Sequence, residues 1–329
     1  RKTVCKVDGT RVEVGLEHRD ETPSSCNQAR LMQSGLNLSW MVRIIIEDPA
    51  LVHFPYQFKP LVKFLESEKN RVLICDEVGL GKTIEAGLIL TEYRARFDVN
   101  RALVVCPSNL CQKWKNELHN RFDEDFQILN STDFMGFLDA FEENPEKAFI
   151  NGIVSIETAR SNRCLQKLDQ IAPDFDIVIV DEAHHMRNFG RKQRRVGEML
   201  SEGALAMIML TATPVQLGIE NLFSLLNILN PDEFPARVDA EERFRMNEPI
   251  VMAQNCLSRI PPLASEAMGF LEQAANYPIV KKNPFYIEAR NADDFLEITM
   301  SENPEDNTKI LAQIEAQKVL SELNLIGNC

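Results

Sequence analysis

One short run, from Asp76 to Thr83, combines two glycines with an adjacent lysine and threonine. It follows an apolar segment typical of a β-strand, Arg71 to Cys75, and precedes a helix-like segment, Ile84 to Phe97. A glycine turn between a strand and a helix directs backbone N–H groups into the loop, where the helix dipole favours anions. The order of these elements therefore predicts a phosphate-binding loop, and an ordinary glycine turn is the alternative.

The predicted loop departs from the usual G-x-x-x-x-G-K-[ST] pattern because Asp76 stands where the first glycine belongs. In such a loop, Lys82 would contact the β- and γ-phosphates and the Thr83 hydroxyl would bind Mg²⁺. The pattern thus indicates ATP with Mg²⁺ as the ligand. The residues expected to contact the nucleotide here are Glu77, Val78, Gly79, Leu80, Gly81, Lys82 and Thr83.

Two adjacent carboxylates follow a second apolar run further along the chain. Residues 176–180 read Asp-Ile-Val-Ile-Val, which is typical of a strand buried on both faces, and Asp181 and Glu182 come next. Asp181 would hold Mg²⁺ opposite Thr83, directly or through water. Glu182 would polarise the water that attacks the terminal phosphate. Taken alone, the acidic pair would be a solvated loop, but the phosphate loop makes it a candidate catalytic element.

Several further motifs, in a fixed order, make the chain resemble a known family. It resembles the first RecA-like lobe of Swi/Snf-type DNA translocases, within superfamily two of the helicase-like ATPases. The wording is closest to the bacterial RNA-polymerase-associated branch of that family. The segments that carry the resemblance are DEVGLGKTIEAG (76–87), DEAHHMRN (181–188), LTATPVQ (210–216), NLFSLL (221–226), LVVCP (103–107), QKW (112–114), the segment 153–158 and PYQ (55–57).

The resemblance implies roles for residues that composition alone would not single out. Gln57 would contact the adenine edge of ATP. His184, Thr211 and Thr213 would couple the state of the nucleotide to movement of the lobe, with His184 linking two motifs by hydrogen bonds. Double-stranded DNA would run across Ser108 to Gln112 and the segment 153–158.

A basic run follows the acidic pair: Arg187, Arg191, Lys192, Arg194 and Arg195. Such a run contacts nucleic-acid phosphates or covers a solvated loop and helix face, and both interpretations stay open. Arg187, Arg191 and Lys192 join Ser108 and Gln112 as candidate DNA-binding residues.

Base stacking by Trp114 and metal binding by the histidines are two candidate roles, but the surrounding residues do not favour either. Leu110 and Leu118 lie four residues on either side of Trp114, so a core position is expected rather than stacking on a base. His184 and His185 lack a third ligand nearby, and none of the eight cysteines forms a C-x-x-C pair, so no zinc site is expected. The cysteines are expected to be reduced.

The motif-bearing part of the chain alternates predicted strands and helices, which favours an α/β fold with a mainly parallel sheet covered by helices on both faces. Ligand loops then gather at the carboxyl ends of the strands, which would place the three motifs along one edge. The predicted strands are 72–75, 102–106, 126–129, 149–154, 177–180 and 206–210. The predicted helices lie near 58–66, 83–97, 108–120, 132–142, 157–170, 192–201 and 219–229.

Three regions are expected. Residues 1–50 have no assigned role, although 10–14 and 41–46 are typical of strands. Residues 51–231 match the RecA-like lobe, and 232–329 predict a mainly helical protrusion that includes an amphipathic segment at 310–323. The net charge is −13, and residues 232–329 hold 17 acidic and 9 basic side chains, so the acidity is concentrated outside the lobe.

The predicted function is that of an ATP-binding lobe of a DNA motor in the cytoplasm. Nothing after residue 231 resembles the family's second RecA-like lobe, so nucleotide binding with weak hydrolysis is expected. RNA polymerase is a possible protein partner by resemblance alone. No membrane helix or secretory signal is expected from the sequence. The alternatives are a fragment of a strand-separating helicase and a nucleotide-binding interaction module without catalysis.

Overall fold

A computed structural model describes residues 2–7, 10–15, 55–75, 81–212, 218–257, 259 and 262–291, and positions 312, 313, 316, 317, 319, 320 and 323. The chain divides into two compact units, Arg1–Pro55 and Tyr56–Cys329. In the first unit, β1 (Lys2–Val7) and β2 (Thr10–Gly15) form an antiparallel pair in which Val7 lies opposite Thr10. This confirms the strand predicted at 10–14, and the one predicted at 41–46 lies outside the described residues.

A six-stranded sheet forms the centre of the second unit, and its strands pair in the order β3-β8-β7-β4-β6-β5. Every neighbouring pair is parallel, which confirms the predicted α/β fold. All six strands lie close to their predicted positions. Their bounds are β3 (Arg71–Ile74), β4 (Arg101–Cys106), β5 (Gln127–Leu129), β6 (Ile150–Ser155), β7 (Phe175–Val180) and β8 (Ala204–Leu210).

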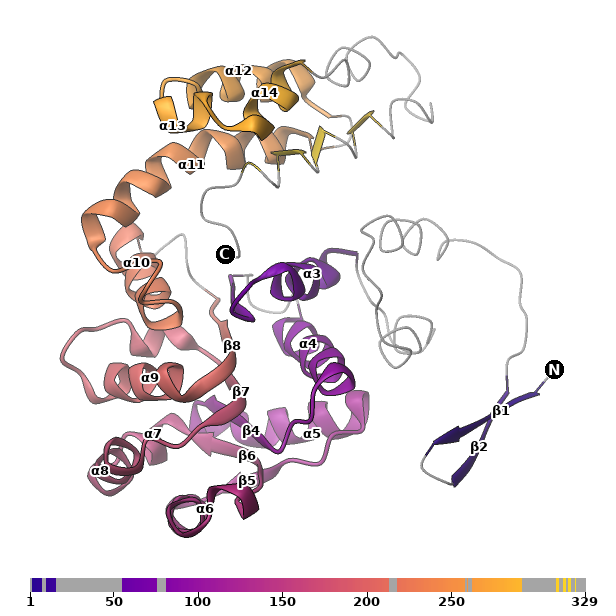
Figure 1. Ribbon diagram of the computed structural model, residues 1–329, viewed down its shortest axis with the longest axis vertical. Coiled ribbons are helices and arrows are strands. Elements are labelled where there is room, and N and C mark those ends of the chain that lie inside the picture. Colours follow the sequence, from indigo (N-terminus) through magenta and orange to yellow (C-terminus); the bar gives the residue numbers. More distant parts are fainter. Residues whose placement is uncertain are drawn as a thin grey trace. The chain divides into compact units, whose positions relative to one another are not determined.

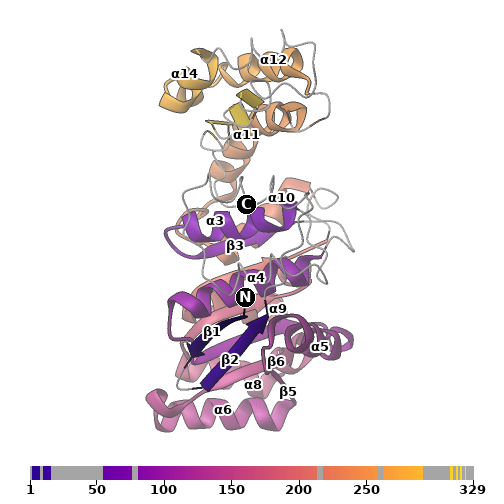
Figure 2. The ribbon, with the colours of Figure 1, turned by 90° about the vertical axis from the view of Figure 1, so that its right-hand side faces the viewer.

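Helices cover both faces of this sheet (Figure 1). Figure 2 looks onto the face that carries α4 and α5, with the sheet behind them. One face carries α3 (Lys59–Glu66), α4 (Lys82–Arg96) and α5 (Cys111–Phe122). The other carries α6 (Ser131–Glu143), α8 (Asn162–Ile171), α9 (Lys192–Gly203) and α10 (Gly218–Leu229), which share one core.

The central strands are apolar throughout because both of their faces are covered. In β7, Ile177 to Val180 are at most 1% exposed. Alternate residues such as Val178 and Val180 join the core under α6, α8, α9 and α10. This is why continuous apolar runs, rather than alternating ones, located the strands correctly.

The helix expected at 157–170 is two helices, so that prediction was wrong in detail. Residues Ile156–Ala159 form α7, and α8 begins only at Asn162. The Ser155 side chain accepts a hydrogen bond from Thr158 N (3.0 Å), and Ser161 accepts one from Cys164 N (3.4 Å). Because each serine caps the start of its own helix, the helical conformation is interrupted between Ala159 and Asn162. The helix near 108 likewise starts as a 3₁₀ turn, Ser108–Leu110.

After the sheet, α11 (Arg237–Leu257) belongs to two cores. Its first part contributes Ala240 and Phe244 to the core beside the sheet. Its later part packs with α12 (Ala264–Ala274), α13 (Pro278–Lys281), α14 (Pro284–Asn291) and helical positions between 312 and 323. Within the described ranges, none of the helices has the length and apolar character needed to cross a bilayer.

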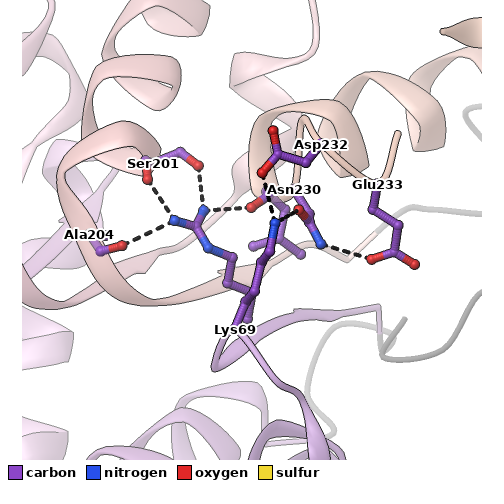
Figure 3. A network of polar contacts seen from close by, with 8 residues as sticks. Lys69, Ser201, Ala204, Asn230, Asp232 and Glu233 are labelled. Atoms are coloured by element: carbon purple, nitrogen blue, oxygen red, sulfur yellow. Dashed lines mark hydrogen bonds and ion pairs between the residues drawn. The ribbon is translucent and has the colours of Figure 1, made fainter. Parts of the chain in front are cut away.

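A polar cluster at the amino end of β3 ties the edge strand to the helices beside it. Arg71 donates to Ser201 O (2.7 Å), Ala204 O (3.0 Å) and Leu229 O (2.6 Å), and also to the Ser201 hydroxyl (2.6 Å). Figure 3 shows Ser201 and Ala204 in this cluster, with Lys69 bonded to Asn230 and Asp232. A cation here satisfies carbonyls at the ends of α9 and α10, where the helix dipoles are negative.

Replacing Arg71 with methionine should lower the free energy of unfolding by about 2–3 kcal/mol, because several partly buried carbonyl oxygens lose their donor. Chemical denaturation measures the change. Lys69→Met is the matched control, since the Lys69–Asp232 pair is exposed and should contribute much less. Equal losses in the two variants would contradict this role for Arg71.

Candidate functional site

Backbone hydrogen bonds join neighbouring strands at the carboxyl end of the sheet, the edge at which the ligand loops were predicted to gather. Thr211 N, just past β8, donates to Ile74 O at the end of β3 (3.0 Å). Asp181 N, just past β7, donates to Val105 O in β4 (2.8 Å). The segments after β3, β8 and β7 therefore leave the sheet side by side, as the alternating pattern predicted.

Gly81 ends the predicted phosphate loop and begins α4. Its φ of 95° lies in the left-handed region that favours glycine. A Cβ atom at this position would lie 2.3 Å from Nε2 of Gln57, so the absent side chain also makes room for that amide. Gln57, in the 3₁₀ turn Pro55–Phe58, is 2% exposed. The structure thus brings Gln57 against the loop's end, while its contact with adenine stays a prediction.

Residues Lys82 and Thr83 form the first turn of α4, where backbone N–H groups have no partner within the helix. This is the arrangement that binds anions. Other residues predicted for the nucleotide site lie outside the described residues: Glu77, Val78, Gly79 and Leu80.

Two hydrogen bonds orient the Asp181 carboxylate. Oδ1 accepts from Glu182 N (2.8 Å), and Oδ2 accepts from the indole N–H of Trp114 (2.8 Å). Trp114 is 1% exposed, so the predicted core position is confirmed. Its polar contact with the candidate metal ligand was not foreseen, because helical spacing indicates burial but says nothing of what a ring nitrogen meets.

The backbone of Glu182 is left-handed, with φ of 50° and ψ of 45°. A residue with a side chain rarely adopts this conformation, which costs roughly 1 kcal/mol. The turn directs the chain out of β7 into the short helix Ala183–Met186. Asn70, Asp123 and Ala172 share this left-handed conformation, so it describes the turn and does not by itself mark a functional residue.

Burial and the neighbouring Asp181 carboxylate raise the pKa of Glu182 above its ordinary value, and Lys82 and His185 partly oppose the rise. The strands that lead to α4 and to the acidic pair, β3 and β7, finish at the same end of the sheet with only β8 between them. The structure therefore brings together the two halves of the site that the sequence predicted separately.

His184 lies beside Glu182, with Nδ1 3.1 Å from Oε2. Neither atom has a hydrogen-bond partner of suitable geometry among the described residues. Burial and the neighbouring His185 and Arg187 lower the pKa of His184, which favours neutral imidazole. We therefore regard this contact as a close approach of polar groups and not as an ion pair.

The predicted coupling role of Thr211 and His184 stays a prediction. Thr211 is fully buried, and its hydroxyl has no hydrogen-bond partner among the described residues. Thr213 lies outside the described residues. A buried hydroxyl that lacks a partner in the described part of the chain calls for an explanation, and a bound group is one.

Arg194 is buried, so neither interpretation of the basic run describes it. It is 2% exposed, donates to the Ser224 hydroxyl (2.6 Å) and bonds Glu198 (2.8 Å), and its guanidinium lies 3.7 Å from the centroid of the Phe189 ring. The Ser224 hydroxyl in turn donates to Arg187 O. Arg194 therefore joins α9 and α10 to the segment that follows the acidic pair. Arg195 pairs with Asp169 on the surface.

A groove of about 710 Å³ is lined in part by the segment that follows the acidic pair. Its basic side chains are Arg160, Arg191 and Lys192, and its single acidic one, Glu157, accepts from Ser108 N (3.2 Å). The remaining lining residues are Ser161, His185, Asn188, Gly190 and Gln193. The residues at the break between α7 and α8 form part of the wall of this groove. Because one continuous helix was predicted here, the groove was not predicted.

The groove brings together some of the candidate DNA-binding residues and not others. Arg191 and Lys192 line it, and Lys192 also donates to Asn162 Oδ1 (2.6 Å). Gln112, which bonds Asn116 on α5, and Arg187, which donates to His184 O (3.3 Å), are not among the lining residues. Arg160 was missed, although it lies only two residues after the segment 153–158.

The oxygen donors at this edge fit Mg²⁺, which prefers carboxylate, hydroxyl and water ligands. Each Asp181 oxygen accepts a single bond among the described residues and so keeps a free lone pair. Oε2 of Glu182 and the Thr211 hydroxyl are buried without a hydrogen-bond donor in the described part of the chain. Thr83, the other predicted ligand, lies in the first turn of α4.

Comparison with known families identifies the class of the chain. The SNF2-related domain matches residues 38–268. The chain therefore belongs to the SNF2-related family, as its motifs predicted.

The relatives reported below belong to the branch that the amino-acid sequences of the motifs suggested. The RNA polymerase-associated protein RapA of Yersinia pestis (strain Pestoides F) is 36% identical over 185 residues, which is 55% of this chain and 19% of that protein. RapA of Erwinia tasmaniensis is 34% identical over 206 residues, covering 61% and 21%. The chain thus spans about a fifth of the length of these relatives.

Among solved structures, a Sulfolobus solfataricus SWI2/SNF2 ATPase core in complex with double-stranded DNA aligns with 74% of this chain and 62% of that one. The identity is 15% and the TM-score is 0.45.

Replacing Glu182 with glutamine should stabilise the protein increasingly as the pH rises. The pKa of Glu182 is raised by burial and Asp181, so its ionisation disfavours the folded state once the pH passes the ordinary pKa of about 4.3. Urea unfolding between about pH 4.5 and 8 measures the difference between variant and wild type. Glu146→Gln, at an exposed position, is the control. A difference that shrinks with rising pH would contradict the assigned environment.

Proposed function

We propose that residues 51–231 are the ATP-binding lobe of an ATP-dependent, translocase-like DNA motor. The observation that carries the proposal is that β3, which leads to Lys82 at the start of α4, and β7, which leads to Glu182, finish at the same end of the parallel sheet with only β8 between them. A cation at a helix N-terminus facing a carboxylate after a buried strand is the arrangement that phosphoryl-transfer ATPases need. Membership of the SNF2-related family supports the same conclusion.

In this proposal each residue has a separate task. Lys82 and the backbone at Gly79–Thr83 neutralise phosphate charge, and Gln57 contacts the adenine. Thr83 and Asp181 would hold Mg²⁺, which neutralises charge on the phosphate oxygens when bound. Glu182 accepts a proton from the attacking water, and its raised pKa brings it closer to the operating pH of a general base.

Duplex DNA is the proposed polymer substrate, and the groove is its proposed phosphate contact. Arg160, Arg191 and Lys192 place three positive charges around one carboxylate, Glu157, which already accepts from Ser108. Ser108 and Gln112 lie on the adjoining exposed surface. Residues 232–329 carry −8 of the net charge of −13, so residues 1–231 carry only −5, and a local basic groove there would attract phosphate.

The motor requires more than this lobe. In related phosphoryl-transfer enzymes, an arginine finger contributes about 10³–10⁵ to turnover. We propose that a second RecA-like lobe supplies this group, that residues 232–329 form a helical protrusion, and that the present chain alone binds ATP but hydrolyses it slowly. The names of its relatives make RNA polymerase a candidate partner and the bacterial cytoplasm the candidate location.

Lys82→Ala should abolish ATP binding because the phosphates lose their main counter-charge. Glu182→Gln should bind ATP normally and lower turnover by about 10²–10⁴ because the base is absent. Both variants are measured by ATP binding and by ATPase rate with duplex DNA, in a chain that continues through a second lobe. Normal turnover by Glu182→Gln would contradict the assigned base.

An ATPase unaffected by DNA in the longer chain would favour a nucleotide-binding interaction module. Separation of DNA strands would favour the helicase alternative.

Arg160→Gln and Arg191→Gln should each weaken DNA binding at all sequences and reduce the slope of log K against log salt by about 0.9. Fluorescence anisotropy with a labelled duplex at several salt concentrations measures both effects. Arg195→Gln is the matched control, because Arg195 lies on α9 next to the groove but pairs with Asp169. Equal effects of all three substitutions would place the DNA elsewhere.

A further inference from the structure

Trp114 combines complete burial with a hydrogen bond to a charged group. Its side chain is 1% exposed, and its indole N–H lies 2.8 Å from Oδ2 of Asp181. The indole nitrogen is a donor only, and it requires an acceptor when it is buried. Phenylalanine would serve packing alone, so the N–H identifies a second task.

The hydrogen bonds to Asp181 leave its carboxylate little freedom to rotate. Glu182 N holds Oδ1 and Trp114 holds Oδ2, each at 2.8 Å. The backbone N–H of Asp181 is bonded to β4. One lone pair on each oxygen stays available in a fixed direction.

The helix that carries Trp114 is itself firmly placed. Cys111, at the first position of α5, has its Sγ 3.6 Å from Sγ of Cys106 at the end of β4. At the far end of α5, the Phe122 ring packs directly against Gly87: a Cβ atom built on Gly87 would lie only 2.2 Å from Cε2 of that ring. Gly87 belongs to α4, whose first turn holds Lys82 and Thr83. One helix therefore contacts both halves of the site.

We propose that Trp114 is a positioning residue that holds the Asp181 carboxylate in the orientation needed to bind the Mg²⁺ of the nucleotide complex. The proposal rests on the proposed nucleotide site and adds a residue that acts on the metal affinity of that site through Asp181. Partners that orient a metal ligand typically contribute about 10–100-fold to metal affinity.

Trp114→Phe tests the proposal because it keeps an aromatic ring and removes the donor. Binding of a fluorescent ADP analogue is titrated with Mg²⁺, and the same binding is measured in EDTA. The Mg²⁺ concentration for half-maximal enhancement should rise about 10-fold, while affinity in EDTA stays within a factor of two. Phe134→Leu, at a buried position on α6 on the opposite face of the sheet from Trp114, controls for loss of packing and should leave the Mg²⁺ dependence unchanged.

A second measurement uses the native tryptophan and does not depend on a destabilising variant. The chain has two tryptophans, so Trp40→Phe leaves Trp114 as the only one. Adding Mg²⁺ to the ADP complex of this variant should change the emission of Trp114.

The outcomes separate the two proposals. If the wild-type chain binds no ADP in either condition, the nucleotide site and this inference both fail. If ADP binds but Trp114→Phe leaves the Mg²⁺ dependence of binding unaltered, only the positioning role is overturned. The same holds if the fluorescence emission of Trp114 does not change when Mg²⁺ is added. A shift of equal size in Phe134→Leu would also overturn it.

Discussion

The parallel pairing of β3, β8 and β7 is the constraint on which the site depends. Parallel strands end at the same edge, so the residues after them leave the sheet together. Thr211 N reaches the end of β3 and Asp181 N reaches β4, which fixes this edge through backbone hydrogen bonds. In the sheet, β8 alone separates β3, which leads to Lys82, from β7, which leads to Glu182. A short segment after each strand is therefore enough to place both residues at this end of the sheet.

Around this edge, buried polar groups join the motifs to their supports. Arg194 and Ser224 hold the segment after the acidic pair against α9 and α10, and Trp114 holds Asp181 from the opposite face. Arg71 performs a comparable task at the other end of β3. The helices therefore do more than cover apolar strands. They supply donors that fix the backbone and the carboxylate from which the proposed chemistry would proceed.

The strands could be predicted from sequence because strands buried on both faces are apolar throughout, as Ile177 to Val180 illustrate. The motifs singled out Lys82, Asp181 and Glu182 as candidates, since residue type and spacing indicate the chemistry that such groups can perform. The break between α7 and α8 was missed because two serine caps interrupt a pattern that is otherwise helical. The hydrogen bonds of Trp114 and Arg194 were not predicted because their partners lie 67 and 30 residues away, beyond any local pattern.

The most direct test of the account is a crystal structure of the chain with Mg²⁺, ADP and a beryllium fluoride mimic of the terminal phosphate. The account predicts that Lys82 contacts the β-phosphate and the mimic, and that Asp181 binds Mg²⁺ directly or through water. Trp114 should still donate to Asp181, and Glu182 should face the mimic. Nucleotide bound away from α4, or Asp181 and Glu182 turned away from its phosphates, would contradict it.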